Sequence, residues 1–290
     1  MKKHKLFLSA VITLFLLSVS IDALGWGFWG HKEISRGAIT LLPKEMMPFF
    51  QAHRGYVIEH SVDPDKARKE DSLEQFNHFI DIDYYGKYPF TELPRSYDDA
   101  AAKFTADTLR EYGLLPWKID EFTRKLSEAM KSGDSLKIMF HAAYLSHYVA
   151  DAHVPLHATL NYDGQFSDQK GVHRRFESDM PERYGRDFQY KWPDSLSVIE
   201  NPLENAFAVV LHSYTMLDDL LAADKAALTA YPAPPATEGE RRPRMTDEYY
   251  TEFRKRLGDT PERRIEAAMA AVASHWYTAW VMAGRPELKP

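Results

Sequence analysis

A short stretch of the chain brings together five side chains that could bind a metal. His147 and Asp151 lie four residues apart, His157 follows them, and His173 and Glu177 repeat the same spacing. On a helix, residues i and i+4 lie side by side, so each pair would present an imidazole and a carboxylate together. Zinc prefers such ligands, and three protein ligands plus a water are typical of catalytic zinc. The pattern therefore indicates a zinc hydrolase.

A hydrogen-bonded pair without metal is the alternative interpretation of His147 and Asp151. The chain has 12 histidines, so some clustering is expected by chance. The second pair, with His157 between the two, favours a metal. His153 fits neither pair and is expected either to support the ligands from outside the site or to serve in packing, and His141 is expected to be structural.

The helix that positions the first pair is predicted at about 135–152. Gly133 and Asp134 end the preceding helix and cap this one. Pro155 removes a backbone donor and bends the chain, which would turn His157 toward the same centre. The apolar residues expected on the buried face, beside His147 and Asp151, are Leu136, Phe140, Ala143 and Ala150.

Helical periodicity recurs along the chain, no strand pattern is evident, and we predict an all-α fold. It would be a single mostly helical domain, residues 26–290. Further helices are expected at 31–54, from 96 onward, and at 119–130, 205–224, 247–257 and 261–283. Other segments are a long ordered excursion at 57–95, a loop at 159–172 and a polar linker at 230–246.

The first 25 residues have the features of a secretory signal peptide. Lys2, Lys3 and Lys5 precede an apolar run over residues 6–20, and Ala23-Leu24-Gly25 is a small-x-small cleavage site. An uncleaved anchor is the alternative, but the run is short for a span of about 20 residues. We expect cleavage after Gly25, no transmembrane span after processing, and a periplasmic or secreted protein.

Composition excludes some classes of function and site. The net charge is −6, and removal of residues 1–25 would make it −8, so electrostatic capture of nucleic acid is not expected. We therefore predict no stable nucleic-acid partner. The chain has no cysteine, which excludes disulfides and thiolate metal sites.

Four motifs together carry a resemblance to a known superfamily. The block from His147 to Glu177 resembles the zinc-dependent phospholipase C superfamily, which includes the fungal and plant single-strand-specific nucleases. Three upstream segments resemble motifs of the same superfamily in the same order: Trp26-Gly27-Phe28-Trp29-Gly30-His31, Pro64-Asp65-Lys66-Ala67-Arg68 and His78-Phe79-Ile80-Asp81.

The resemblance implies three zinc ions in a mostly helical fold. The first would be held by Asp65, His78, His147 and Asp151. The second would be held by His157, His173 and Glu177. The third would be held by His31, Asp151 and the amino and carbonyl groups of Trp26, so that Asp151 bridges two ions and signal-peptide cleavage creates a ligand.

Two choices stay open. The Asp-x-x-Arg register selects Asp65 as the ligand, whereas the spacing to the following histidine in the nucleases would select Asp63. Glu177 matches the phospholipases, whereas the Trp-Gly-x-x-Gly-His start matches the nucleases. The substrate is therefore a phospholipid headgroup ester or single-stranded nucleic acid, with the first preferred.

The resemblance implies a phosphodiesterase in which a zinc-activated water attacks phosphorus. Asp65, Arg68 and Asp151 are the expected catalytic residues, with Asp65 orienting the water and Arg68 balancing phosphoryl charge. Phe79 and Asp81 are candidates for substrate binding. The protein is expected to be a monomer. A non-catalytic zinc protein, whose metals only hold the fold, is the rival hypothesis.

Overall fold

The computed structural model describes residues 26–193, 195–235 and 244–290, and these residues form helices and loops without a strand. The predicted all-α fold is confirmed. The predicted signal peptide and most of the predicted linker lie outside the described residues. The longer helices are α1 (Gly27–Leu41), α5 (Tyr97–Phe104), α7 (Leu115–Ser132), α8 (Ser135–Ala152), α11 (Pro202–Tyr214), α12 (Leu217–Ala230), α13 (Asp247–Leu257) and α14 (Thr260–Met282).

Short helical segments connect these helices and carry several of the candidate ligands. The α-helical ones are α2 (Met47–Ala52), α3 (Arg54–His60), α4 (Asp63–Ala67), α6 (Ala106–Glu111), α9 (Val172–Arg174) and α10 (Met180–Tyr184). The remainder are four 3₁₀ turns, η1 (Glu74–Asn77), η2 (Ile82–Tyr85), η3 (Pro155–Ala158) and η5 (Gly185–Asp187), and a π-helical turn, η4 (Arg175–Asp179).

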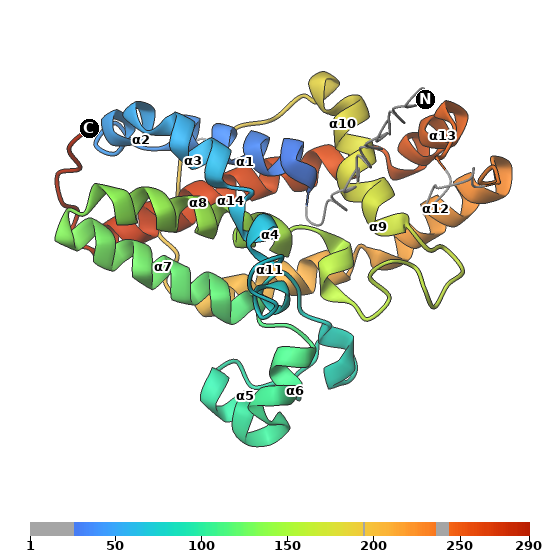
Figure 1. Cartoon of the computed structure of the whole chain (residues 1–290), viewed down its shortest axis with the longest axis horizontal. Coiled ribbons are helices and arrows are strands. Elements are labelled where there is room, and N and C mark those ends of the chain that lie inside the picture. The colour runs from blue at the N-terminus through green and yellow to red at the C-terminus, as the bar shows by residue number, and fades with distance from the viewer. Residues whose placement is uncertain (1–25, 194, 236–243) are drawn as a thin grey trace, which may run out of the picture.

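Helices α1, α7, α8 and α14 lie along the long axis of the molecule and enclose the core (Figure 1). Helix α8 packs between α7 and α14, and α1 packs against both α14 and α8. Trp276 of α14 is fully buried and donates its indole N–H to the carbonyl of Ala142 at 3.1 Å. Helices α5 and α6 project from this body as a separate lobe (Figure 1).

Helix α8 begins and ends where the sequence predicts. Gly133, in the left-handed region at φ +73°, ends α7, and the Asp134 carboxylate accepts a hydrogen bond from the Lys137 N–H. The predicted buried face is wrong at its start, because Leu136 is 73% exposed and Phe140 is 38% exposed. This face of the first turns of α8 extends beyond the core, and every residue of the helix is buried only from Leu145 onward.

Two predicted helices are each divided in the structure. The segment 31–54 breaks after Leu42, where Pro43 cannot continue the helix, and the chain resumes as α2 and α3. The segment 205–224 breaks at Thr215 and Met216, between α11 and α12. The predicted excursion 57–95 contains part of α3, all of α4, and the turns η1 and η2.

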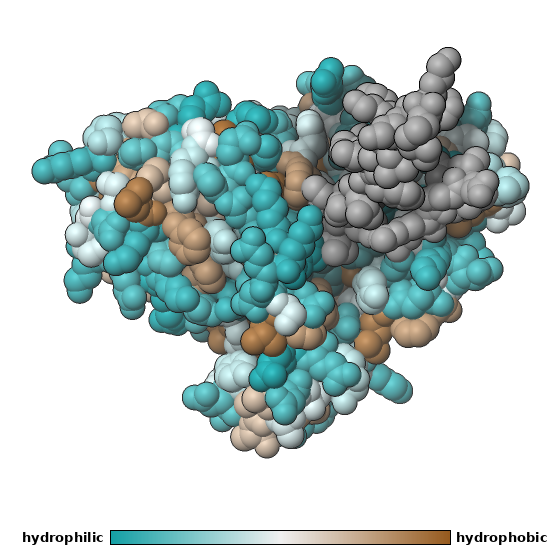
Figure 2. Space-filling model, viewed as in Figure 1, coloured by the Kyte–Doolittle hydropathy of each residue, from teal (hydrophilic) through white to brown (hydrophobic). Residues whose placement is uncertain are grey.

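Among the described residues, one stretch is long and apolar enough to cross a membrane. It spans Pro202–Ala230, and an 18-residue window within it has a mean hydropathy of 1.2 and is 39% buried. It comprises two helices, of which α11 packs against α7 and α12 packs against α13. Core helices have the same composition, so length and hydropathy are weak evidence for a span here. On the described part of the face in Figure 2, hydrophilic residues predominate and hydrophobic ones are scattered.

A buried ion pair holds the segment of His173 and Glu177 against the C-terminal helices. Arg175, in η4, donates to both oxygens of Asp224 on α12, from Nε at 2.8 Å and from Nη2 at 2.9 Å. Tyr249 of α13 and Gln169 also donate to this carboxylate. Asp224 is fully buried, so its charge depends on these donors.

We expect Asp224→Ala to lower the free energy of unfolding by about 3–5 kcal/mol, because it leaves the Arg175 charge buried and unpaired. Asp219→Ala, on the exposed side of the same helix, is the control and should change it by less than about 0.5 kcal/mol. Urea denaturation of both variants measures the difference. A loss of unfolding free energy below about 1 kcal/mol for Asp224→Ala would contradict this account of the Arg175–Asp224 ion pair.

Candidate metal centre

Asp151 lies at the centre of the candidate site, and its two oxygens face different groups. Oδ2 is 3.0 Å from His78 Nδ1 and 3.2 Å from His147 Nε2. Oδ1 is 3.4 Å from His31 Nε2. The carboxylate is fully buried, at the end of α8. A carboxylate with this placement could bridge two cations.

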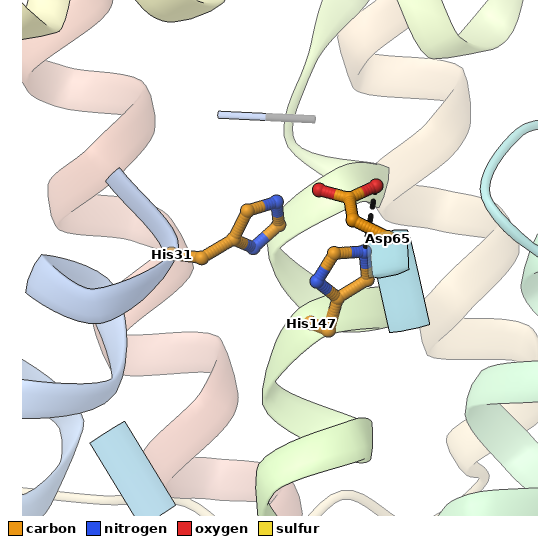
Figure 3. Close-up of side chains that lie close together, drawn as sticks. All are labelled: His31, Asp65 and His147. Carbon is orange, nitrogen blue, oxygen red and sulfur yellow. Dashed lines mark ion pairs between the residues drawn. The ribbon is translucent and has the colours of Figure 1, made fainter. Parts of the chain in front are cut away.

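Residues from three helices meet beside Asp151. His31 of α1, Asp65 of α4 and His147 of α8 have ligand atoms within 4.8 Å of one another, and all three side chains are buried. They point toward a common space (Figure 3). The rings of His31 and His147 stack with centroids 3.9 Å apart, and His147 Nε2 is 3.8 Å from Asp65 Oδ1.

His78, His147 and Asp151 form a second group that overlaps the first. His78 follows η1, and its Nδ1 is 3.0 Å from His147 Nε2. The resemblance assigns His31 to a different ion from Asp65 and His147, whereas the structure brings these three together. The two groups are therefore contiguous. They share His147, and Asp151 of the second group lies beside His31 of the first.

A third group comprises His157, His173 and Glu177. Pro155 begins η3, and this turn directs His157 toward the segment that carries the other two. His157 Nε2 is 3.0 Å from His173 Nε2 and 3.2 Å from Glu177 Oε2, and His173 Nε2 is 2.8 Å from the same oxygen. All three side chains are buried.

Backbone carbonyls select the tautomers of two imidazoles. His147 donates Nδ1–H to the carbonyl of Ser61 at 2.8 Å, and His157 donates Nδ1–H to the carbonyl of His78 at 2.6 Å. In each neutral ring the lone pair is then on Nε2, the atom that faces its group. Histidines that bind metals are commonly oriented in this way.

The types of ligand atom in the three groups fit zinc. Imidazole nitrogens and carboxylate oxygens converge in each group, and these are ligands that zinc prefers. Several buried atoms in these groups have no hydrogen-bond partner among the described residues. They include both ring nitrogens of His31, His78 Nε2, Asp65 Oδ2, Asp151 Oδ1 and Glu177 Oε1. Buried polar atoms of this kind are costly unless a cation or donor meets them.

The electrostatics of the groups also favour positive charge between the side chains. Burial would raise the pKa of Asp151, but the charges and hydrogen bonds of neighbouring imidazoles, His147 first, hold it well below its ordinary value. Burial and the neighbouring His147 lower the pKa of His31, which keeps that imidazole neutral. Burial raises the pKa of Glu177 to about 8, with a partial offset from the neighbouring His157.

Trp26 packs against α8 and the segment that carries Glu177. Its side chain is fully buried, its indole N–H donates to the carbonyl of Ala150 at 2.9 Å, and its ring contacts Phe176 at a centroid distance of 5.8 Å. A Cβ added at Gly30 would lie only 2.7 Å from Cβ of Trp26. The close approach explains why the turn between Trp26 and His31 carries glycine.

The structure places Asp65 inside the first group and Asp63 outside all three. Asp63 pairs with His60 at 2.5 Å and with Lys66 at 2.8 Å. Arg68 donates Nη2–H to Asp65 Oδ1 at 2.5 Å, and its side chain is 14% exposed. The pair is therefore positioned at the edge of the group.

The remaining candidates lie near the groups but belong to none of them. Asp81 is buried, and burial together with the charge of Asp83 raises its pKa to about 8. Phe79 is half-buried beside Gly113. His153 donates Nδ1–H to the carbonyl of Val149 at 2.8 Å, as expected of a packing residue. Sequence reasoning missed Glu74, which contacts His78.

Comparison with known proteins gives the family. A family model described as zinc dependent phospholipase C matches residues 30–226, which is more than half of the chain. The chain belongs to the zinc-dependent phospholipase C family. The predicted family is thereby confirmed. No match is found among curated proteins.

Two solved structures share the fold of this phospholipase C family member. Alpha toxin from Clostridium absonum superposes with a TM-score of 0.53 and 13% identity over 90% of this chain and 65% of the toxin. The alpha-toxin of Clostridium perfringens, from an avian strain, gives 0.50 and 14% over 90% of this chain and 64% of the toxin. The chain thus spans less than two thirds of the length of these toxins, and the similarity concerns the fold.

Removal of metal is expected to destabilise the protein, because the convergent acceptors of the three groups would lose their cation. At a zinc concentration 1,000-fold above Kd, one bound ion stabilises by about 4 kcal/mol. For a chain of this size that raises Tm by roughly 10 °C. Thermal denaturation with EDTA, and then with zinc in excess, measures the shift.

Asp151→Asn is the matched variant, since it removes charge without changing side-chain size. Its Tm should respond to zinc less than that of the wild type. If EDTA and zinc leave the wild-type Tm unchanged, the three groups do not bind metal.

Proposed function

We propose that this protein is an exported zinc-dependent phosphodiester hydrolase of the phospholipase C type. The observation that carries the proposal is the placement of Asp151, whose two oxygens face His31 on one side and His78 with His147 on the other. Family membership supports zinc as the metal. Export is inferred from the predicted signal peptide over residues 1–25.

Three zinc ions would use the residues of the three groups. One would be held by Asp65, His78, His147 and Asp151, and one by His157, His173 and Glu177. The third would be held by His31, Asp151 and the terminal amino and carbonyl groups of Trp26. The burial of Trp26 next to α8 supports a ligand role for its backbone once residues 1–25 are removed.

The group of His157, His173 and Glu177 favours catalysis over a purely structural role. It offers three protein ligands, and catalytic zinc sites typically have three, with a water or substrate in the fourth position. Structural sites usually have four protein ligands. The rival hypothesis of a non-catalytic zinc protein is therefore less well supported.

Zinc, when bound, supplies a Lewis acid for phosphoryl oxygens and a water of lowered pKa. Asp65 Oδ2 is buried without a hydrogen-bond partner among the described residues, so this oxygen can accept the proton of the attacking water. Arg68 is held by Asp65 Oδ1 and can balance charge on the phosphoryl group. Phe79 and Asp81 follow His78 directly and are proposed to contact the substrate.

The proposed substrate is a phospholipid, cleaved between phosphorus and the glycerol oxygen. The family match and Glu177 support it, as does the absence of a basic excess in the chain. Both alpha-toxins are named as toxins, and their activity is not transferred to this shorter chain. The alternative is single-strand-specific nuclease activity, and the experiment must distinguish it from phospholipid hydrolysis.

Purified protein beginning at Trp26 is expected to release phosphocholine from phosphatidylcholine and no nucleotides from single-stranded DNA or RNA. Asp65→Asn should reduce kcat by about 100-fold or more, because it removes the proton acceptor. Asp219→Asn is the exposed control and should retain wild-type kcat. Nucleotide release without phosphocholine would instead establish the nuclease.

An extra Met before Trp26 is expected to weaken one zinc and the activity together, by about tenfold or more, because it displaces the terminal amine. An extra residue after Pro290 is the control and should change neither. Metal content after dialysis and hydrolysis rate are measured on the same samples. Three retained zinc ions with full activity would exclude the amine as a ligand.

A further inference from the structure

Glu74 contacts His78 on the side away from the metal groups. Nδ1 of His78 is directed into its group, 3.0 Å from both Asp151 Oδ2 and His147 Nε2. Nε2 of the same ring has no hydrogen-bond partner among the described residues, and it lies 3.5 Å from Glu74 Oε1, within ion-pair distance. The two nitrogens of His78 therefore face two carboxylates, one inside the group and one outside it.

The Glu74 carboxylate is held in place by two other donors. Tyr148 donates its hydroxyl to Oε1 at 2.5 Å, and Asn77 donates Nδ2–H to Oε2 at 2.8 Å. The Glu74 side chain is 14% exposed, and Tyr148 is buried on α8, one residue after His147. The carboxylate thus links η1, which precedes His78, to the helix that carries His147 and Asp151.

His78 differs from His147 and His157 in which ring nitrogen faces the metal group and in what the other nitrogen faces. His147 and His157 direct Nε2 at their groups and donate Nδ1–H to a backbone carbonyl. His78 directs Nδ1 at its group, and its outer nitrogen faces a carboxylate. A carboxylate that accepts the Nε2 proton would hold it more strongly than a carbonyl does, and it would make the opposite nitrogen a better electron donor to a metal.

We propose that Glu74 is a positioning residue for His78, which keeps the proton on Nε2 and strengthens the binding of zinc at Nδ1. This inference rests on the proposed role of His78 as a zinc ligand. Glu74 contacts neither zinc nor substrate, because the imidazole ring lies between its carboxylate and the group. Tyr148 and Asn77 act on His78 only indirectly, because their hydrogen bonds fix the Glu74 carboxylate.

The test is the zinc affinity of each ion, measured by chelator competition on protein beginning at Trp26. Glu74→Gln should weaken one ion by about 10- to 100-fold and leave the ion at His157, His173 and Glu177 unchanged. Tyr148→Phe keeps the carboxylate but removes a donor, so a smaller loss at the same ion is expected. Glu70→Gln, exposed on the same segment, is the control and should match the wild type.

The outcomes separate this inference from the proposed function. If the wild type binds no zinc with the His78 ligand, the proposed function fails and this inference fails with it. If the wild type binds zinc and Glu74→Gln binds it equally well, only this inference is wrong. A purely structural role would weaken all the ions alike and lower the Tm of the metal-free protein, and that result would also overturn it. Should Glu74→Gln not fold, the Tyr148→Phe result decides.

Discussion

The structure depends on a fully buried carboxylate, Asp151, surrounded by imidazoles. A buried charge is costly unless it is paired, and here the partners come from α1, α8 and the segment after η1. The imidazoles can supply positive charge only by taking protons, and the orientation of His147 leaves a lone pair directed inward. A divalent cation would satisfy the carboxylate and the lone pairs together.

The helical body positions this centre through contacts that are remote from it. Helix α8 is enclosed by α1, α7 and α14, which fixes the depth of His147 and Asp151. The segment with His173 and Glu177 is held from its outer side by the ion pair of Arg175 with Asp224. The carbonyl of His78 accepts from His157, so the second and third groups are also connected directly.

Local rules predicted the elements that depend on neighbours in sequence. Gly133, Asp134 and Pro155 bound α8 because caps and proline act within a few residues. The same rules overestimated the buried face of α8, because periodicity does not tell how far a helix extends beyond its core. Segment 57–95 was predicted only as an excursion, since helices of five to seven residues such as α3 and α4 show too little periodicity.

The sequence by itself determined the fold class and which residue types could bind metal, because these follow from periodicity and from spacing within single segments. The family followed from the resemblance of four short motifs to a known superfamily. Only the tertiary structure decided how those residues group. It brought His31 beside Asp65 and His147, placed Asp63 outside, and revealed Glu74 behind His78. Some of these contacts join segments that are distant in sequence, and others depend on side chains from other helices. Packing of the helices therefore determines them.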